Sequence, residues 1–386
     1  MNAMLIRLAE VLYQGVWSLW ERGYRGRFLP IREVSPRLIS VGNLTWGGTG
    51  KTPLVELLAK KLYRQGRKVA ILSRGYGSPR DRGSADEVRW LRQRLNGIPI
   101  FANPDRVQSA QKAEKEGYEV LILDDGFQHR RLARQLDIVT IDAGNPFGNG
   151  RLIPAGKLRE PISSLKRADW IVLTKTDLVD EKRLNSIKEG IREVVPEIPM
   201  SETVYRPLAL SVIPSLRSGR RLRSLPRQTK SGGRDDEESK GTRGSLAQGD
   251  RGNGEVFPQD LKGREVGLVA AIGNPEGFKR TVAQLGAKVT ATYWKRDHSD
   301  YSMADLQKLA EIERKKALWG WVTTSKDAIK IVPLIERTQC LALSTQHLAP
   351  STQPLAKGPT LYALEIELIF KTGESELWEA IESLLS

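Results

Sequence analysis

The sequence GNLTWGGTGKTP, residues 42–53, follows the short apolar run RLISV at 37–41 and is the strongest indication of the fold class. Gly50, Lys51 and Thr52 match the end of the phosphate-binding pattern G-x-x-x-x-G-K-[ST], although Thr45 stands where the first glycine belongs. Glycines 47 and 48 let backbone N–H groups curve around phosphate oxygens, and the helix that follows adds its dipole. We therefore predict a strand, a nucleotide-binding loop and a helix in succession. The expected nucleotide-binding residues are Thr45, Trp46, Gly47, Gly48, Thr49, Gly50, Lys51 and Thr52.

A second motif ends a later apolar run, where LILDD at 121–125 places two carboxylates side by side. The carboxyl end of a strand beside a phosphate loop is where a magnesium-organising aspartate belongs. We expect Asp124 or Asp125 to hold Mg²⁺, directly or through water, together with the hydroxyl of Thr52. A helix cap or a turn is the alternative for two acids at this position.

Short β-branched runs alternate with helical stretches along most of the chain. The runs lie at 37–41, 68–73, 119–123, 136–141, 170–174, 265–272, 287–294, 320–324 and 361–368, with helices expected at 53–65, 107–116, 276–285, 303–315 and 374–385. This alternation predicts an α/β fold. We expect a P-loop NTPase-type, mostly parallel sheet flanked by helices, a second smaller α/β domain and an N-terminal amphipathic helix.

Composition divides the chain further. Residues 215–254 hold eight glycines and six serines and no aromatic residue, which predicts a disordered low-complexity insert or linker. We therefore expect an N-terminal helix at 1–30, a P-loop domain at 31–214 and a smaller C-terminal domain at 255–386. The last helix could pack on either domain.

The chain of 386 residues carries 61 Lys and Arg against 46 Asp and Glu, a formal net charge of +15. A balance this basic favours an anionic partner: a nucleic acid, a phosphorylated substrate or an anionic membrane. No motif of a nucleic-acid-binding fold accompanies the charge, so we expect no nucleic acid as partner. A single cysteine and three histidines argue against a disulfide framework and a cysteine-based zinc site.

Residues 3–21 are expected to form one amphipathic helix. Its polar residues form a narrow stripe at spacings of three and four, and its wide apolar face includes Trp17 and Trp20. Arginines at 22, 25, 27 and 32 follow, where anionic headgroups would lie if the helix rested on a membrane. Packing of the same apolar face on the domain core is the alternative.

The motifs together resemble the tetraacyldisaccharide 4'-kinase family, the lipid A 4'-kinases of Gram-negative bacteria. The resemblance rests on GNLTWGGTGKTP (42–53), ILSRGYG (71–77), ILDDGFQHRRL (122–132), RLIPAGKLREP (151–161), IGNPEGF (272–278), DHSDYS (297–302) and TTSKDAIK (323–330). It implies transfer of the γ-phosphate of ATP, with Mg²⁺, to the 4'-hydroxyl of tetraacyldisaccharide 1-phosphate, a lipid A precursor, to form lipid IVA in lipid A biosynthesis. It also implies a monomeric, peripheral or monotopic enzyme on the cytoplasmic face of the inner membrane.

The resemblance assigns roles to individual residues. Lys51 and Thr52 match the family's P-loop lysine and hydroxyl, and Asp124 and Asp125 match its metal-organising acids. The family activates the acceptor hydroxyl with an aspartate in a GDEP motif, which here reads SADEVRW at 84–90, so Asp86 takes this role although the flanking Gly and Pro differ. Its partner histidine corresponds to His298. The alternatives are a helix cap for Asp86 and a loop histidine for His298.

The acceptor carries a phosphate and hydroxyls, which arginine forks suit. Arg74 and Arg106 follow predicted strands on the expected ligand edge, and Arg159 and His129 lie in the quoted motifs, so these four residues are the candidate substrate contacts. For His129 a proton relay, a substrate contact and a structural role remain open.

The main competing hypothesis is a P-loop GTPase or an NTP-driven switch without a sugar acceptor. TKTD at 174–177 follows a strand and resembles the guanine-reading NKxD box. A simple strand-to-helix turn is the interpretation that we favour for this segment.

Overall fold

The computed structural model describes residues 3–75, 82–213, 256–297, 299–344 and 358–386. Side chains are described from Met4 onward, except those of residues 82–86 and 338–344. The predicted insert at 215–254 and the candidate His298 therefore lie outside the described residues.

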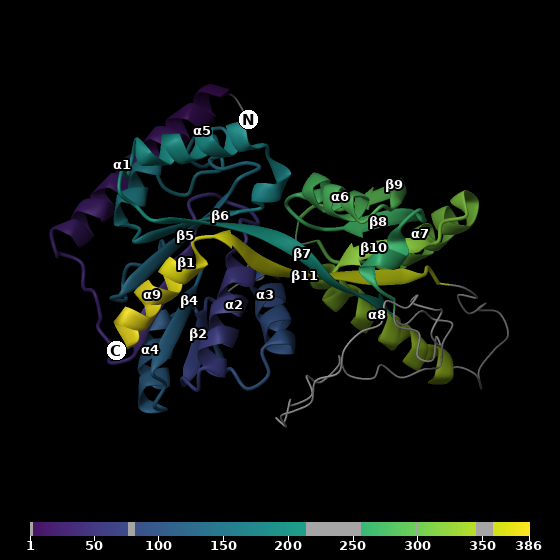
Figure 1. The fold of residues 1–386 in the computed structure, drawn as a ribbon, viewed down its shortest axis with the longest axis horizontal. Coiled ribbons are helices and arrows are strands. Elements are labelled where there is room, and N and C mark those ends of the chain that lie inside the picture. The colour runs from purple at the N-terminus through teal and green to yellow at the C-terminus, as the bar shows by residue number, and fades with distance from the viewer. Residues whose placement is uncertain (1–2, 76–81, 214–255, 298, 345–357) are drawn as a thin grey trace, which may run out of the picture.

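One eleven-stranded sheet runs through the molecule (Figure 1). Its order is β3-β2-β4-β1-β5-β6-β7-β11-β10-β8-β9, and all neighbouring pairs are parallel except the antiparallel pair of β7 and β11. The strands are β1 (Arg37–Gly42), β2 (Val69–Ser73), β3 (Ile100–Ala102), β4 (Val120–Asp124), β5 (Leu136–Asp142), β6 (Trp170–Thr174), β7 (Met200–Ile213), β8 (Glu265–Ala270), β9 (Lys288–Trp294), β10 (Gly320–Thr324) and β11 (Leu361–Thr372).

Helices cover both faces of this sheet in the first lobe, which we define as β1 to β6 with α1 to α5. These helices are α1 (Ala3–Arg25), α2 (Lys51–Arg64), α3 (Arg82–Arg94), α4 (Arg106–Lys115) and α5 (Glu181–Arg192). The apolar sides of α2 and α3 pack on one face, and α4 and α5 pack on the other. Because helices bury both faces, β2, β4 and β6 are buried along their whole length and almost entirely apolar instead of alternating.

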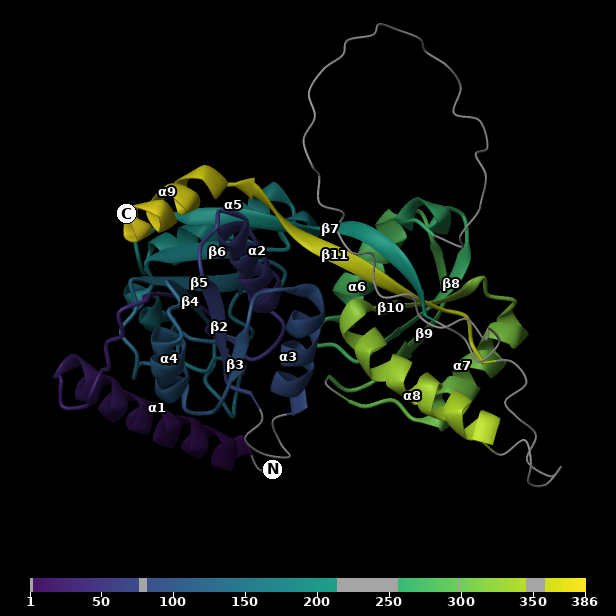
Figure 2. The ribbon, with the colours of Figure 1, turned by 90° about the horizontal axis from the view of Figure 1, so that it is seen from below.

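The second lobe consists of β8 to β10 with α6 (Pro275–Gln284), α7 (Met303–Lys316) and α8 (Ser325–Ser344). Strands β7 and β11 run side by side from one lobe to the other (Figure 2). Near its start β7 pairs with β6 of the first lobe, and near its start β11 pairs with β10 of the second. The two long strands therefore join the lobes by continuous backbone hydrogen bonding as well as by the chain itself.

The last helix, α9 (Glu374–Leu385), packs on the first lobe. Its Leu377, Trp378 and Ile381 are buried in the cluster that contains the apolar side of α2. The ammonium of Lys61 on α2 lies 4.0 Å from the centre of the Trp378 ring. The chain thus leaves the first lobe along β7, forms the second lobe and returns along β11.

Helix α1 lies at the outside of the first lobe (Figures 1 and 2). Its protein-facing side is mixed, with Glu10 and Glu21 beside the partly buried Tyr13 and Trp20. Glu10 pairs with Arg151, Glu21 pairs with Arg130, and the hydroxyl of Tyr13 donates a 2.6 Å hydrogen bond to the carbonyl of Arg159. Most of its large aliphatic side chains are exposed: Met4, Leu5, Leu8, Val11, Leu12, Val16 and Leu19. The contact with the protein therefore involves aromatic as well as charged side chains of the helix, and most of its aliphatic side chains face away.

The predicted strands and helices recur at nearly the predicted residues, which confirms the α/β fold class. The sequence patterns did not predict α5, α8, β3 or the fourteen-residue strand β7, and they indicated α3 only through the possible helix cap at Asp86. Pro207 and an irregular alternation of buried and exposed residues obscure β7 in the sequence. It forms because β11 supplies backbone partners over almost its whole length.

Candidate active site

The phosphate loop and the acidic pair meet at the carboxyl edge of the sheet. Strands β1 and β4 are parallel neighbours, with Val41 opposite Asp124 in register. The loop leaves β1 at Gly42, and α2 begins at Lys51. Gly50 has a φ of 89°, and a Cβ placed there would lie 2.7 Å from the hydroxyl of Tyr205. Glycine is therefore required at this position by backbone conformation and by close packing.

The backbone of the loop is held from the neighbouring strands. The hydroxyl of Thr174 donates to the carbonyl of Thr49 at 2.9 Å, and the ammonium of Lys175 donates to the carbonyl of Gly48 at 2.8 Å. Lys175 also pairs with Asp142. The segment 174–177 forms the end of β6 and a short 3₁₀ turn, and its lysine side chain is engaged by the phosphate loop and Asp142.

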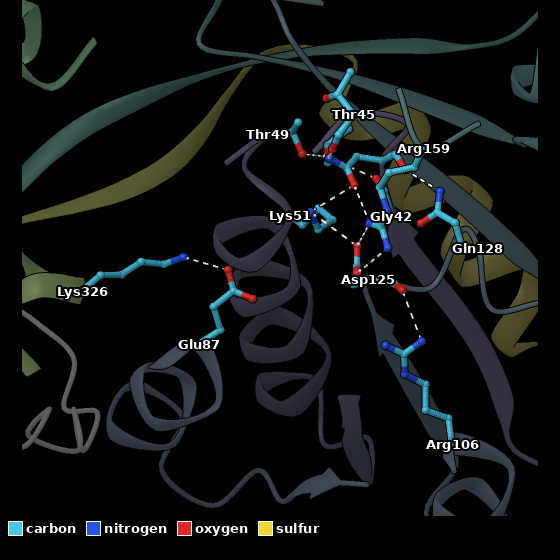
Figure 3. A network of polar contacts seen from close by, with 12 residues as sticks. Gly42, Thr45, Thr49, Lys51, Glu87, Arg106, Asp125, Gln128, Arg159 and Lys326 are labelled. Atoms are coloured by element: carbon cyan, nitrogen blue, oxygen red, sulfur yellow. Dashed lines mark hydrogen bonds and ion pairs between the residues drawn. The ribbon is translucent and has the colours of Figure 1, made fainter. Parts of the chain in front are cut away.

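Lys51 lies at the centre of a polar network (Figure 3). Its ammonium is 3.1 Å from Oδ1 of Asn43 and 3.5 Å from Oδ1 of Asp125. The guanidinium of Arg159 donates hydrogen bonds to both carboxylate oxygens of Asp125, at 2.7 and 3.1 Å. Arg106 donates to the backbone carbonyl of Asp125 at 3.4 Å. The second acid of the motif is thus bound by cations on several sides.

The two neighbouring aspartates have opposite electrostatic environments. Burial alone would raise the pKa of Asp125, but Lys51 and Arg159 hold it well below its usual range. For Asp124, burial followed by the charges of Glu87 and Asp125 raises the pKa to about 7. Asp124 is 3% exposed, and its Oδ1 has no hydrogen-bond partner among the described residues. A buried carboxylate oxygen of this kind is suited to a cation.

The residues present fit a magnesium ion. The side chain of Thr52 is buried at the first turn of α2, and Asp124 ends the neighbouring strand β4. Over the described part of the chain there is no group of three or more His, Cys, Asp or Glu side chains that could hold a metal by themselves. Mg²⁺ commonly takes one or two protein ligands and completes its shell with water and substrate phosphates, which this donor set allows.

A basic cluster borders the acidic pair. Arg106 is 6% exposed, and its Nε finds no partner within the described segments. Burial lowers its pKa, and the nearby charges of Arg74 and Arg159 lower it further, against the opposite effect of the two aspartates. Nε2 of His129 is also buried and unpartnered in the described structure, and burial followed by Arg106 lowers its pKa to about 4. An anion beside this cluster would relieve the repulsion between its arginines.

The structure brings some of the candidate residues together and leaves others undescribed. Lys51, Asp125, Arg159 and Arg106 form one network, whereas Arg74 is exposed at the end of β2. Asp86 lies on α3, but its side chain is outside the description. The next residue, Glu87, pairs with Lys326 on α8 at 3.0 Å.

Two residues of the network were missed by the sequence analysis. Asn43 accepts hydrogen bonds from Lys51 and Arg159, and Gln128 donates to the carbonyl of Asn43 at 2.9 Å. Both residues lie inside the quoted motifs, so their place beside the loop and the acidic pair was the available signal.

A phosphate loop between β1 and α2, with an acidic pair on the adjacent parallel strand, defines a P-loop nucleotide-binding protein. Sequence comparison identifies the branch of that class. The chain belongs to the tetraacyldisaccharide-1-P 4'-kinase family, whose sequence profile matches residues 2–358.

Individual relatives agree with this assignment. The chain is 34% identical to the tetraacyldisaccharide 4'-kinase of Halothermothrix orenii over 84% of its own length and 82% of the relative. It is also 34% identical to that of Anaeromyxobacter dehalogenans strain 2CP-C over 85% and 81%. Among solved structures, that of LpxK from Aquifex aeolicus in complex with ATP matches all of both chains with a TM-score of 0.62 at 24% identity, a likeness in fold.

Proposed function

We propose that this protein is an ATP-dependent kinase that transfers the γ-phosphate of ATP to the 4'-hydroxyl of tetraacyldisaccharide 1-phosphate, forming lipid IVA in lipid A biosynthesis. The observation that carries the proposal is the phosphate loop facing Asp124 and Asp125 in a chain that the family profile matches over residues 2–358. The competing GTPase switch is not favoured, since the family to which the chain belongs consists of kinases.

Residues 45–52 bind the phosphates of ATP in this proposal. Backbone N–H groups of the loop and the first turn of α2 face the phosphate oxygens, and Lys51 neutralises charge on the β- and γ-phosphates. Asp125 and Asn43 hold the Lys51 ammonium at the mouth of the loop before the nucleotide arrives. Thr52 and Asp124 are the residues that would hold Mg²⁺, supported by the unpartnered oxygen of Asp124. When bound, the ion screens charge that builds up on the transferring phosphoryl group.

Asp86 is the proposed base for the acceptor hydroxyl. A sugar hydroxyl is a weak nucleophile, so a carboxylate that accepts its proton during in-line attack is expected. Support comes from the neighbouring residue Glu87, whose pKa responds to Lys51 and Asp125, so this turn of α3 lies near the nucleotide site. His298 is proposed to orient Asp86.

Arg74, Arg106 and His129 are proposed to contact the acceptor. Their support is the cluster of like charges and unpartnered buried nitrogens beside the acidic pair. Arg159 was expected to contact substrate, and its bidentate bond to Asp125 supports a positioning role as well. A neutral His129 near pH 7 presents both a donor and an acceptor to a sugar hydroxyl.

Helix α1 is proposed to rest on a membrane, so that the acyl chains of the acceptor stay in the lipid. The support is its row of exposed apolar side chains, of which Leu12 is 63% and Leu19 is 68% exposed. Phe28 is 86% exposed just beyond the helix, beside arginines that suit anionic headgroups. No helix within the described ranges is long and apolar enough to cross a membrane.

The remaining proposals concern organisation. We place the enzyme on the cytoplasmic face of the inner membrane as a peripheral or monotopic monomer. Residues 31–214 and 255–386 are proposed as its two domains, with α9 packed on the first.

A transfer assay tests the proposed function. Purified protein is incubated in detergent with γ-labelled ATP, Mg²⁺ and tetraacyldisaccharide 1-phosphate, and the lipid fraction is counted. We expect label in the lipid, dependent on Mg²⁺ and lost in Asp86→Ala. Label released only as inorganic phosphate, indifferent to the lipid and greater with GTP, would refute the kinase and favour a nucleotide switch.

A further inference from the structure

An ion pair joins the two lobes beside the phosphate loop. Lys326 is the second residue of α8 in the second lobe, and Glu87 lies on α3 in the first, with Nζ and Oε1 3.0 Å apart (Figure 3). The preceding residue, Ser325, accepts a 3.1 Å hydrogen bond from Nε1 of Trp90. Glu87 and Trp90 are three residues apart and share one face of α3. The start of α8 is therefore docked on that face at two adjacent points.

Glu87 faces positive charge from both lobes. Burial would raise its pKa, but Lys326 and then Lys51 hold it below its usual value. Conversely, Glu87 raises the pKa of Lys326 against the effect of burial, and Asp124 adds to this increase. The pair is thus in electrostatic contact with the lysine of the phosphate loop and with the buried acid of the proposed metal site.

The pair is poorly explained as a source of stability. The side chains of Lys326 and Glu87 are only 33% and 27% exposed, and the cost of removing a partly buried ion pair from water offsets much of its attraction. Its position is more informative, because Asp86 is the residue directly before Glu87 on the same helix. A contact that holds Glu87 in place therefore also restrains the backbone of Asp86, the proposed base.

We propose that Lys326 is a positioning residue that reaches across the lobes to Glu87 and holds the start of α3, with Asp86, against the nucleotide site. This inference rests on the role proposed for Asp86. Loss of the contact would leave nucleotide binding at the phosphate loop intact but would loosen the alignment of base, hydroxyl and γ-phosphate. Misplacement of a reacting group by about 1 Å can cost roughly 100-fold in rate.

The test combines kinetics with an exchange measurement in the full-length protein. Lys326→Met, Glu87→Gln and the double variant are compared with Lys315→Met, a control that removes an exposed lysine paired within α7 of the same lobe. We expect Lys326→Met to lower kcat for lipid phosphorylation roughly tenfold while the Kd for ATP stays within about twofold. The double variant should lose no more than the worse single variant, because both act through one contact. Backbone amides at 88–94 should exchange hydrogen for deuterium faster in Lys326→Met than in wild type or control.

Several results would overturn the proposal. Wild-type kcat and wild-type exchange in Lys326→Met would show that the contact positions nothing. If the fold-losses in kcat of the two single variants multiplied in the double variant, Lys326 and Glu87 would act independently of each other. A Kd for ATP that rises in step with the fall in kcat would make Lys326 a direct nucleotide contact. Failure of wild type to phosphorylate the lipid would instead refute the proposed function, and the exchange of α3 would still show whether Lys326 holds that helix.

Discussion

At the scale of single residues, two aspartates that are adjacent in sequence have different electrostatic environments in the site. Asp124 and Asp125 are consecutive, yet Asp125 is held ionised by Lys51 and Arg159 while Asp124 is buried with a pKa of about 7. Asp125 has a φ of 53°, so the backbone turns at the end of β4 and directs the two side chains differently. The sequence predicted an acidic pair but could not say which carboxylate carries the free oxygen.

Substitutions of Lys51 and of Asp86 should have different effects on ATP binding and turnover. Lys51→Ala removes charge-assisted bonds to phosphate and should weaken ATP binding roughly tenfold or more, as well as nearly abolishing turnover. Asp86→Ala should lower turnover by roughly 10² to 10⁴-fold with ATP affinity retained, since a base acts only on the hydroxyl. Equilibrium ATP binding and initial rates on the lipid separate the two. An equal loss of ATP affinity in both variants would contradict the role given to Asp86.

His129 should remain neutral at physiological pH. Burial and neighbouring arginines lower its pKa to about 4, whereas the unfolded chain has an ordinary histidine pKa of about 6.5. The unfolded state therefore binds more protons between these values, so the free energy of unfolding should fall as pH drops from about 6.5 toward 4. Histidine NMR titration gives the pKa directly, and His129→Gln identifies the signal.

The same variant gives the stability control. The pH dependence that His129 contributes should disappear from urea unfolding of His129→Gln between pH 6.5 and 4. A titration of His129 near pH 6.5 would contradict the buried environment described for its ring.

At the scale of elements, α1 was predicted as a helix, but the side by which it contacts the protein was not. The period-3.6 pattern predicted an amphipathic helix but did not determine which side meets the protein. Ion pairs from Glu10 and Glu21 to arginines far along the chain, with Tyr13 packed beside them, hold one side of α1 against the first lobe. Those arginines are positioned by the fold, so the sequence near α1 could not reveal the contact.

The exposed side of α1 should drive binding to anionic vesicles. Leu8→Asp with Leu12→Asp should weaken binding roughly tenfold or more, because each buried leucine contributes about 1.5–3 kcal/mol. Flotation with liposomes containing anionic lipid measures the effect. Leu208→Asp, a change of the same kind at an exposed leucine of β7, is the control. Unchanged flotation of the α1 variant would argue against α1 as the membrane contact.

Residues 216–253 should be dispensable. Val256, just after the segment, forms a β-bridge with Leu210, just before it, so its flanks lie side by side and a short turn can join them. The cost of closing a loop depends only weakly on its length, so deletion should change stability little. Thermal unfolding and the transfer assay on the deletion variant measure this. Loss of folding would show that the segment has a structural role.

At the scale of the whole molecule, the chain returns along β11 from the second lobe to the first, and this return connects the two lobes. The end of β11 pairs with the start of β7, which in turn pairs with β6, and α9 then packs against α2. Arg94 on α3 adds a link, donating to Glu56 on α2 and to Glu365 on β11. The first lobe is therefore completed by residues from the end of the chain.

Trp378 should be important for stability although it lies far from the site in sequence. Its side chain is 4% exposed in the core of the first lobe, so Trp378→Ala should lower the free energy of unfolding by about 3–5 kcal/mol. Trp46→Ala, at a tryptophan that is 68% exposed, should change it by less than about 0.5 kcal/mol. Urea denaturation compares them. Equal stabilities would mean that α9 is not part of the cooperative unit.

Local patterns and contiguous motifs in the sequence were enough to predict the α/β class, most strands and helices, the phosphate loop, the acidic pair and the family. The tertiary structure was needed to show that β7 and β11 join one sheet, that α9 packs on the first lobe and which side of α1 contacts the protein. It also showed that Arg159 is hydrogen-bonded to Asp125 and that Lys326 forms an ion pair with Glu87. Each of these contacts joins segments far apart in the chain, and such pairings depend on where the whole backbone lies, which no local run of residues encodes.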